Sequence, residues 1–386
     1  MIPFDFQLRT RIVFGPGRVD SLGEFACELG ARRALVVSDP GIVAAGHTAR
    51  GIGALDRAGI ETHLFDSVTE NPTDQNVEAG VAMAKKCRPE LIVGFGGGSS
   101  MDCAKGINFV FSCGGRIQDY WGTGKATRPL LPMIAVPTTS GTGSEAQSFA
   151  LISDSQTHVK MACGDKKASC RVALLDPTLT VTQPAGVTAL TGIDAVAHAV
   201  ETYVTNRRNA VSLAFSREAW QLLAENFSKV LAEPTDLDAR GGMQLGACFA
   251  GLAIENSMLG ATHALANPLT AFYGIVHGQA VGMMLPHVIR FNGVEFDAWY
   301  RDLLEYVPST NGDARHGARD DASQALAEVV SRFASLAGLP DRLSQCGVER
   351  DKLPALAEDA ARQWTGTFNP RKVGVEELLA IYETAF

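Results

Sequence analysis

The sequence lacks the features that mark membrane proteins and disulfide-stabilised proteins. No run approaches the roughly 18 consecutive apolar residues of a membrane-spanning helix. The eight cysteines stand singly, without a CxxC pair, in a chain of 386 residues that is large enough to fold without disulfides. The start, MIPFDFQLRT, carries an acidic residue and no long apolar core, unlike a secretory signal. We therefore expect a cytoplasmic protein that does not enter a membrane.

An excess of positive charge is also lacking. The chain has 34 basic and 42 acidic residues, and its net charge of −8 repels the phosphates of nucleic acids and anionic membrane surfaces. What is present is ordinary for an enzyme: 46% of the residues are apolar and 20% are charged. The length favours two domains with separate cores. We expect a small-molecule partner and no nucleic-acid partner.

The pattern of the sequence changes near residue 180. Before it, short β-branched runs alternate with helical patterns long enough to cross over between parallel strands. After Pro177 and Pro184, strand signals largely vanish and apolar residues recur every three or four positions. The fold class is therefore α/β plus all-α, with a Rossmann-like parallel-sheet domain over residues 1–180 followed by a helical domain over residues 181–386. The expected strands are RIVFG, RALVVSD (33–39), THLF (62–65), ELIVGFG (90–96), PMIAVP (132–137) and VALLD (172–176).

A glycine-rich turn, LIVGFGGGSSMDCAKG (91–106), joins a buried strand to a helix. Glycines let a ligand approach the backbone closely, and the N–H groups and dipole at a helix start attract a phosphate. The spacing is not GxGxxG, so the usual dinucleotide fingerprint is absent. The alternative interpretation is a tight turn in which Ser99 or Ser100 caps the helix.

Two further turns end strands of the same sheet. PTTSGTGSEA (137–146) follows an apolar strand where open α/β sheets place ligands. In VVSDPG (36–41), Asp39 could accept hydrogen bonds from an adenosine ribose and repel a 2′-phosphate, which would favour NAD over NADP. Asp-Pro-Gly is equally good turn chemistry.

The second half contains a carboxylate and an imidazole one helical turn apart. In TGIDAVAHAVETY (191–203), Asp194 and His198 leave the same face of a helix and could chelate a divalent metal. Alternatively, Thr191 and Asp194 form a capping box and His198 is a hydrogen-bonded core residue.

Two more imidazoles could complete a metal site. His263 and His277 lie in ATHALANPLTAFYGIVHG (261–278), on either side of Pro268, which we expect to break the segment. One carboxylate and three imidazoles leave a coordination position open, as a catalytic metal requires. The ligand types alone suit Fe, Zn, Co or Ni equally.

Together these stretches resemble the iron-containing, group III alcohol dehydrogenases. The resemblance rests on GGGSSMDCAKG, PTTSGTGSE, the GIDAVAHAVE helix, HALANPL followed by HG, and ENPT at 70–73. It extends from the GPG near residue 15 to FNPR at 368–371. It implies a dehydroquinate synthase-like architecture, with a nucleotide-binding domain, a helical domain, and NAD(P) and the metal between them.

The resemblance also assigns roles to residues. It implies that Asp194, His198, His263 and His277 are the metal ligands and catalytic residues, and it favours Fe²⁺, with Zn²⁺ or another divalent ion possible. It implies that the cofactor pyrophosphate lies on Gly96, Gly97, Gly98 and Ser99. Further cofactor contacts are implied for Thr138, Thr139, Thr142, Ser144, Asn71, Asp102, Phe149, Lys160 and Leu179.

The expected activity is metal-dependent hydride transfer between NAD(H), with NADP less favoured, and a small alcohol or aldehyde. The alternatives are an NAD- and metal-dependent lyase or cyclase of the dehydroquinate synthase type, and a zinc polyol dehydrogenase. One residue departs from the family: many members carry a second histidine four residues after the first of the late pair, where this chain has Asn267. Because asparagine cannot titrate, this position could orient a water but not exchange a proton. The resemblance further implies a homodimer or larger homo-oligomer.

Overall fold

The computed structural model describes residues 3–157, 159–307 and 321–386, and the chain divides into two compact units. One unit is Gln7–Gln183, and the other is Pro184–Phe386 together with the described residues before Gln7. Among the described residues, no helix combines the length and the apolar character that crossing a membrane would require.

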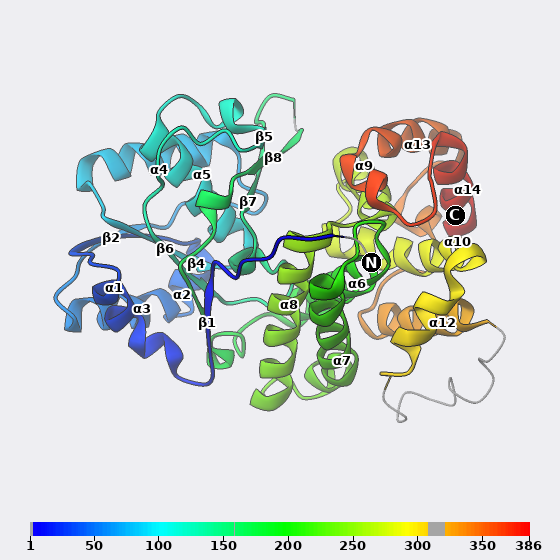
Figure 1. Cartoon of the computed structure of the whole chain (residues 1–386), viewed down its shortest axis with the longest axis horizontal. Helices are drawn as coiled ribbons and strands as arrows, with labels where there is room; N and C mark the ends of the chain where they lie inside the picture. Colours follow the sequence, from blue (N-terminus) through cyan, green and yellow to red (C-terminus); the bar gives the residue numbers. More distant parts are fainter. Residues whose placement is uncertain (1–2, 158, 308–320) are drawn as a thin grey trace. The chain divides into compact units, whose positions relative to one another are not determined.

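The Gln7–Gln183 unit is built on a six-stranded parallel sheet with the strand order β1-β9-β6-β4-β2-β3 (Figure 1). The expected parallel sheet and its six strands are confirmed. They are β1 (Arg11–Phe14), β2 (Arg33–Val37), β3 (Glu61–Phe65), β4 (Leu91–Gly96), β6 (Met133–Pro137) and β9 (Val172–Leu175).

Both faces of this sheet are buried. In β2, Leu35 and Val37 pack in one apolar cluster, whereas Ala34 and Val36 pack in another. Successive side chains of a strand point to opposite faces, so the run of apolar residues requires helices on both sides. The first cluster includes residues of α4 (Asp74–Cys87) and α5 (Gly98–Cys113), and the second includes residues of α1 (Leu22–Glu28) and α3 (His47–Arg57). The short α2 (Pro40–Ala44) follows β2.

A second, three-stranded sheet was not expected from the sequence. It has the order β5-β8-β7 and comprises β5 (Gly122–Thr123), β7 (Phe149–Ser153) and β8 (Lys160–Gly164). In β7, Ala150 and Ile152 are buried while Leu151 is exposed, so the alternation that marks a half-buried strand was present over only five residues.

The second unit is helical, as expected, and its helices surround one apolar core (Figure 1). The helices are α6 (Ala185–Val204), α7 (Ala210–Ala232), α8 (Leu237–Ser257), α9 (Ala261–Tyr273), α10 (His277–Leu304), α12 (Ala322–Leu336), α13 (Leu353–Arg362) and α14 (Val375–Ala385). Short 3₁₀ segments of the chain are η1 (Arg18–Ser21), η2 (Ile117–Tyr120), η3 (Ser144–Ala146), η4 (Lys166–Ala168), η5 (Pro177–Leu179), η7 (Leu343–Cys346), η8 (Arg350–Lys352) and η9 (Trp364–Phe368).

The expected break at Pro268 was wrong, because α9 continues through it to Tyr273. Proline removes one helical hydrogen bond, here to the carbonyl of Ala264. The buried side chains of Leu265 and Leu269 hold this helix in the core despite that loss.

Two capping alternatives were also wrong. Thr191 lies inside α6, where its hydroxyl donates to the carbonyl of Val187 at 2.8 Å, so it does not start a helix with Asp194. Ser99 and Ser100 lie in the first turn of α5, whose N-cap residue is Gly97.

Candidate functional site

Helix α6 carries three polar side chains on one face. Asp194, His198 and Glu201 are spaced by four and three positions, so they share that face. All three are buried, in a helix whose other faces are covered by alanine, valine and isoleucine packed in the core. Ionisable groups are rarely buried without partners, so the other helices must supply them.

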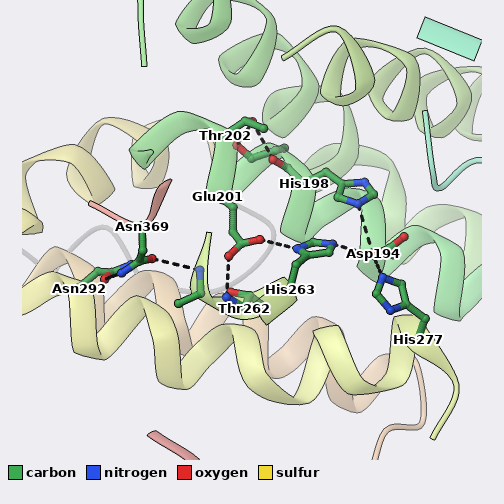
Figure 2. Close-up of polar contacts among 11 residues, drawn as sticks. Asp194, His198, Glu201, Thr202, Thr262, His263, His277, Asn292 and Asn369 are labelled. Carbon is green, nitrogen blue, oxygen red and sulfur yellow. Dashed lines mark hydrogen bonds and ion pairs between the residues drawn. The ribbon is translucent and has the colours of Figure 1, made fainter. Parts of the chain in front are cut away.

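Those partners come from α9 and α10. Oδ1 of Asp194 lies 3.5 Å from Nε2 of His198, 3.4 Å from Nε2 of His263 and 3.9 Å from Nε2 of His277. Figure 2 shows the three imidazoles turned toward the Asp194 carboxylate. Two ligands of one tetrahedral ion with bonds of about 2.1 Å lie about 3.4 Å apart, so these separations suit a shared metal.

Two buried atoms of this group form no hydrogen bond with the described part of the chain. Among the described residues, Oδ1 of Asp194 and Nε2 of His263 are buried and have no hydrogen-bond partner. Unsatisfied buried polar atoms are rare in folded proteins, and a carboxylate oxygen beside imidazole nitrogens is a donor set for a divalent cation. The His277 side chain is 27% exposed, whereas that of Asp194 is 8% exposed, so a ligand can approach from the His277 side.

The charges of this group shift its pKa values. Burial raises the pKa of Asp194, but the neighbouring imidazoles, His198 foremost, outweigh burial and hold that pKa well below its usual range. Burial lowers the pKa of His263, but the carboxylates of Glu201 and Asp194 overcome it and raise the pKa to about 9. In the absence of a metal the site therefore holds a carboxylate and a proton on His263 at neutral pH.

His198 lies close to Asp194 but is not part of the tightest group of donor atoms. The donor atoms of Asp194, His263 and His277 all lie within 4.8 Å of one another. The ring of His198 stacks on that of His263, with 4.9 Å between the centroids and 18° between the planes. The four residues singled out in the sequence are thus brought together, with three of them in the tightest group.

Glu201 was missed by the sequence analysis. Its Oε2 forms a hydrogen bond with Nδ1 of His263, and its Oε1 accepts the backbone N–H of Thr262 at 2.7 Å. A carboxylate on Nδ1 fixes the tautomer, leaving Nε2 to face Asp194 as a ligand. The spacing of Glu201 from Asp194 and His198 on one helical face was the signal that could have identified it.

In the Gln7–Gln183 unit, the glycine-rich turn lies at the start of α5. A Cβ on Gly98 would meet Thr142 Cγ2 at 2.6 Å, and one on Gly97 would meet Thr139 Cγ2 at 3.2 Å. The loops that contain these glycines and threonines are therefore in direct contact. Among the residues that the structure describes, no side chain caps α5, so its first N–H groups can serve a phosphate.

Asp39 lies beside the same turn. Its Oδ1 accepts the N–H of Ile42 and so caps α2, while its Oδ2 accepts the hydroxyl of Ser100 at 3.1 Å. Gly96 has φ +148°, and a Cβ there would lie 3.0 Å from Oδ2 of Asp39. Asp39 therefore caps the helix that begins at the Asp-Pro-Gly turn, and its carboxylate also reaches the glycine turn.

Asn71 approaches this turn from the ENPT stretch. Its backbone has φ +51°, a left-handed conformation that is uncommon for a residue other than glycine. Its N–H donates to Oγ of Ser99 at 3.3 Å. Such strain is commonly kept at ligand-binding positions.

A buried polar cluster supports the second loop. The hydroxyl of Ser144 donates to Asp102 at 2.7 Å and accepts from the ammonium of Lys105 at 2.8 Å. Lys105 is fully buried and also donates to the carbonyls of Ser144 and Phe149. Lys105 was missed by the sequence analysis, although it lies in the quoted DCAKG motif.

The remaining predicted cofactor residues differ in exposure. Thr138 is 2% exposed, and its hydroxyl has no hydrogen-bond partner among the described residues. Lys160 is exposed on β8, whereas Leu179 is packed in the core beneath the sheet. A polar ligand would satisfy the Thr138 hydroxyl, so this atom fits a nucleotide site.

Asn267 lies on α9, one turn after His263. Its Nδ2 donates to Oε1 of Gln363 at 3.1 Å. The Asn267 amide is therefore held in place at the position where many members of the family that the sequence resembles carry a second histidine.

Comparisons with known proteins identify the chain. Residues 9–177 match the family model described as "Iron-containing alcohol dehydrogenase", and residues 188–386 match "Fe-containing alcohol dehydrogenase family, C-terminal". The chain is 35% identical to a 1,3-propanediol dehydrogenase of Klebsiella pneumoniae and 33% identical to an NAD-dependent methanol dehydrogenase of Bacillus methanolicus, each over 99% of both chains. Its structure matches the crystal structure of a 1,3-propanediol oxidoreductase with a TM-score of 0.95, at 34% identity over 100% of both chains.

Proposed function

The chain belongs to the iron-containing alcohol dehydrogenase family, and on that premise we propose that it transfers a hydride between NAD(H) and a short aliphatic alcohol or aldehyde. The observation that carries the proposal is the convergence of Asp194, His263 and His277, two of whose buried donor atoms have no hydrogen-bond partner among the described residues. The relatives named above are oxidoreductases, so the lyase alternative has no support among them.

Asp194, His198, His263 and His277 would hold one divalent cation, with Fe²⁺ as our proposal from the family and Zn²⁺ as the main alternative. The cation supplies Lewis-acid stabilisation of negative charge on the substrate oxygen. The low pKa of Asp194 supports this role, because the carboxylate is ionised at every physiological pH. Glu201 contributes by holding the ring of His263 in one tautomer and one orientation.

The turn at Gly96, Gly97, Gly98 and Ser99 would hold the pyrophosphate of NAD, which supplies the hydride chemistry. Further contacts with the cofactor are proposed for Asn71, Asp102, Thr138, Thr139, Thr142, Ser144, Phe149, Lys160 and Leu179. Asp39 supports a preference for NAD, because its carboxylate lies beside Gly96 and would repel a 2′-phosphate.

The substrate class follows from the site and the relatives. The donor set is buried apart from His277, so a small substrate is favoured, and two of the relatives act by name on 1,3-propanediol and methanol. Asn267 can orient a hydroxyl group or water but cannot take up its proton. The proton must therefore leave by water or by a cofactor hydroxyl.

We also propose that the protein is a cytoplasmic homodimer. None of the eight cysteines, all of which lie in the described residues, forms a disulfide, which suits a reducing compartment. Leu8, just before the edge strand β1, and Phe14, within it, are exposed, and an open edge with exposed apolar side chains is a pairing surface.

The test is an absorbance assay of NADH with methanol, 1-propanol, 1,3-propanediol and propanal, on protein loaded separately with Fe(II), Zn(II) and Ni(II). We expect metal-dependent turnover, and we expect His263→Ala to lose metal content and turnover together. Full activity after chelation would reject the metal site. Bound NAD without any change in NADH across the panel would reject hydride transfer to alcohols.

A further inference from the structure

The first turn of α9, which presents His263, is capped by side chains from outside the helix. Its N-cap residue, Gly260, has no side chain to serve the free amides of that turn. Instead, Thr262 N–H donates to Oε1 of Glu201 at 2.7 Å, and Ala261 N–H donates to Oδ1 of Asn369 at 3.3 Å. The cap therefore comes from α6 and from the segment that follows η9.

Asn369 is itself held by a second amide. Its Nδ2 donates to Oδ1 of Asn292 at 2.7 Å, and Nδ2 of Asn292 donates back to Oδ1 of Asn369 at 3.2 Å (Figure 2). Both side chains are buried. Asn292 lies on α10, the helix whose first residue is His277. The pair thus links the two helices that carry His263 and His277.

The same segment is also hydrogen-bonded to the loop that follows α6. Asn206, just past the end of α6, donates its backbone N–H to the carbonyl of Phe368 and its Nδ2 to the carbonyl of Thr367, each at 2.9 Å. Residues 367–369 therefore contact α9, α10 and the loop that follows α6. These residues overlap the FNPR motif, to which the proposed function assigns no role.

The space around Gly260 is shaped by this cap. A Cβ at that position would lie 3.0 Å from Oε1 of Glu201 and 3.1 Å from Oδ1 of Asn369. Contacts of this length force the neighbouring atoms to move by a few tenths of an ångström. Glycine here allows both oxygens to reach the first turn.

We propose that Asn369 is a positioning residue for the metal site, which acts by capping α9 and so holding His263 in register with His277. The inference rests on the proposed function, because it assumes that these donors bind a metal. His263 is the third residue of α9, in the turn that frays first when a cap is lost. A metal site tolerates displacements of only about 0.5 Å, so a loosened turn lowers metal affinity although Asn369 touches no donor.

The test compares four full-length proteins, each stripped of metal and titrated with Co(II) against a competing chelator well below its melting temperature. They are the wild type, Asn369→Ala, Gly260→Ala and Asn209→Ala. Asn209 is the matched control, since it is buried and caps a helix by accepting the N–H groups of Val211 and Ser212, but that helix, α7, carries none of the donors. If Asn369→Ala does not fold, Gly260→Ala tests the inference in its place, because its methyl group disturbs the same cap from the start of α9.

We expect Asn369→Ala and Gly260→Ala to weaken Co(II) binding by about tenfold, as for groups that orient ligands, and to alter the visible absorption of bound Co(II). Asn209→Ala should keep the wild-type Co(II) affinity while it loses thermal stability. Wild-type affinity in both cap variants, or an equal loss in Asn209→Ala, would overturn the inference and leave the proposed function standing. A wild-type protein that binds no Co(II) would overturn both.

Discussion

Nδ1 of His263 is hydrogen-bonded to the buried carboxylate of Glu201, a residue seven positions beyond Asp194 on the same helix. Since a carboxylate only accepts hydrogen bonds, the Nδ1 proton of the imidazole is held by Glu201, and the proton that a bound metal would displace is the one on Nε2, which faces Asp194. The helix that carries the proposed carboxylate ligand therefore also fixes the Nδ1 proton of an imidazole on another helix.

Replacing Glu201 with glutamine should weaken metal binding by about 10- to 100-fold. The amide is neutral, and an N–H group turned toward Nδ1 would favour the tautomer that places the proton on Nε2. Competition with a chelator measures the affinity. Glu225→Gln, which changes an exposed residue paired with Lys229, should leave it unchanged. An unaltered affinity in Glu201→Gln would show that the contact does not orient His263.

Metal affinity should rise with pH up to about 9. In the metal-free protein the pKa of His263 is about 9, so metal must displace its proton below that pH, and affinity should increase by up to about tenfold per pH unit. The folding stability of the metal-free protein changes with pH in the opposite direction. The protonated imidazole stabilises the fold below pH 6.5, and this stabilisation is lost as pH rises through 9. Titration with Zn(II) at several pH values measures the dependence. A flat profile between pH 7 and 9 would contradict it.

Replacing Asp39 with asparagine should improve the use of NADP. The amide oxygen can still accept the N–H of Ile42, so the cap of α2 is kept while the negative charge is removed. We expect the KM for NADP to fall by about tenfold, with a smaller change for NAD. Steady-state kinetics with both cofactors test this. Equal effects on NAD and NADP would indicate that the carboxylate has only its capping role.

A methyl group at position 98 should weaken cofactor binding. In Gly98→Ala the Cβ would lie 2.6 Å from Cγ2 of Thr142, so Thr142 and the start of α5, both proposed to contact the cofactor, must move apart. We expect the Kd for NADH to rise about tenfold, as measured by fluorescence titration. Gly53→Ala is the control in the same unit, because its Cβ would meet only the end of the Arg57 side chain at 3.6 Å. Unchanged NADH binding in Gly98→Ala would argue against a cofactor role for this contact.

His287 should make the fold sensitive to mild acid. Burial, with the charge of Arg290, lowers its pKa to about 4. The folded state therefore binds a proton less readily than the unfolded state, so stability is full above pH 6.5 and is lost as pH falls toward 4. His287→Gln can still bond the hydroxyl of Thr384 and should flatten the dependence of Tm on pH. Parallel Tm profiles for the two proteins would exclude this residue as the cause.

Local patterns were enough to predict much of this molecule. The apolar run of β4 and the three- to four-residue periodicity of α7 reflect which side chains must be buried. Both patterns involve residues close together in the sequence, so they can be recognised without the structure. Asp194 and His198 could be paired because a helix brings residues four apart onto one face. Their meeting with His263 and His277 was predicted from the family resemblance rather than from spacing. The weak alternation of β7 and the persistence of α9 through Pro268 show where local patterns failed, because packing in the core outweighed them.

Contacts between distant segments depended on the fold. Asn369 meets Ala261 across 108 positions, and Lys105 meets Ser144 across 39. No periodicity links such positions. Each contact forms because a buried amide, carbonyl or charge needs a hydrogen-bond partner, and the packing of the helices and loops determines where that group lies. The residues of the proposed metal site could thus be identified from the sequence, whereas the groups that hold those residues in place could be identified only from the three-dimensional structure.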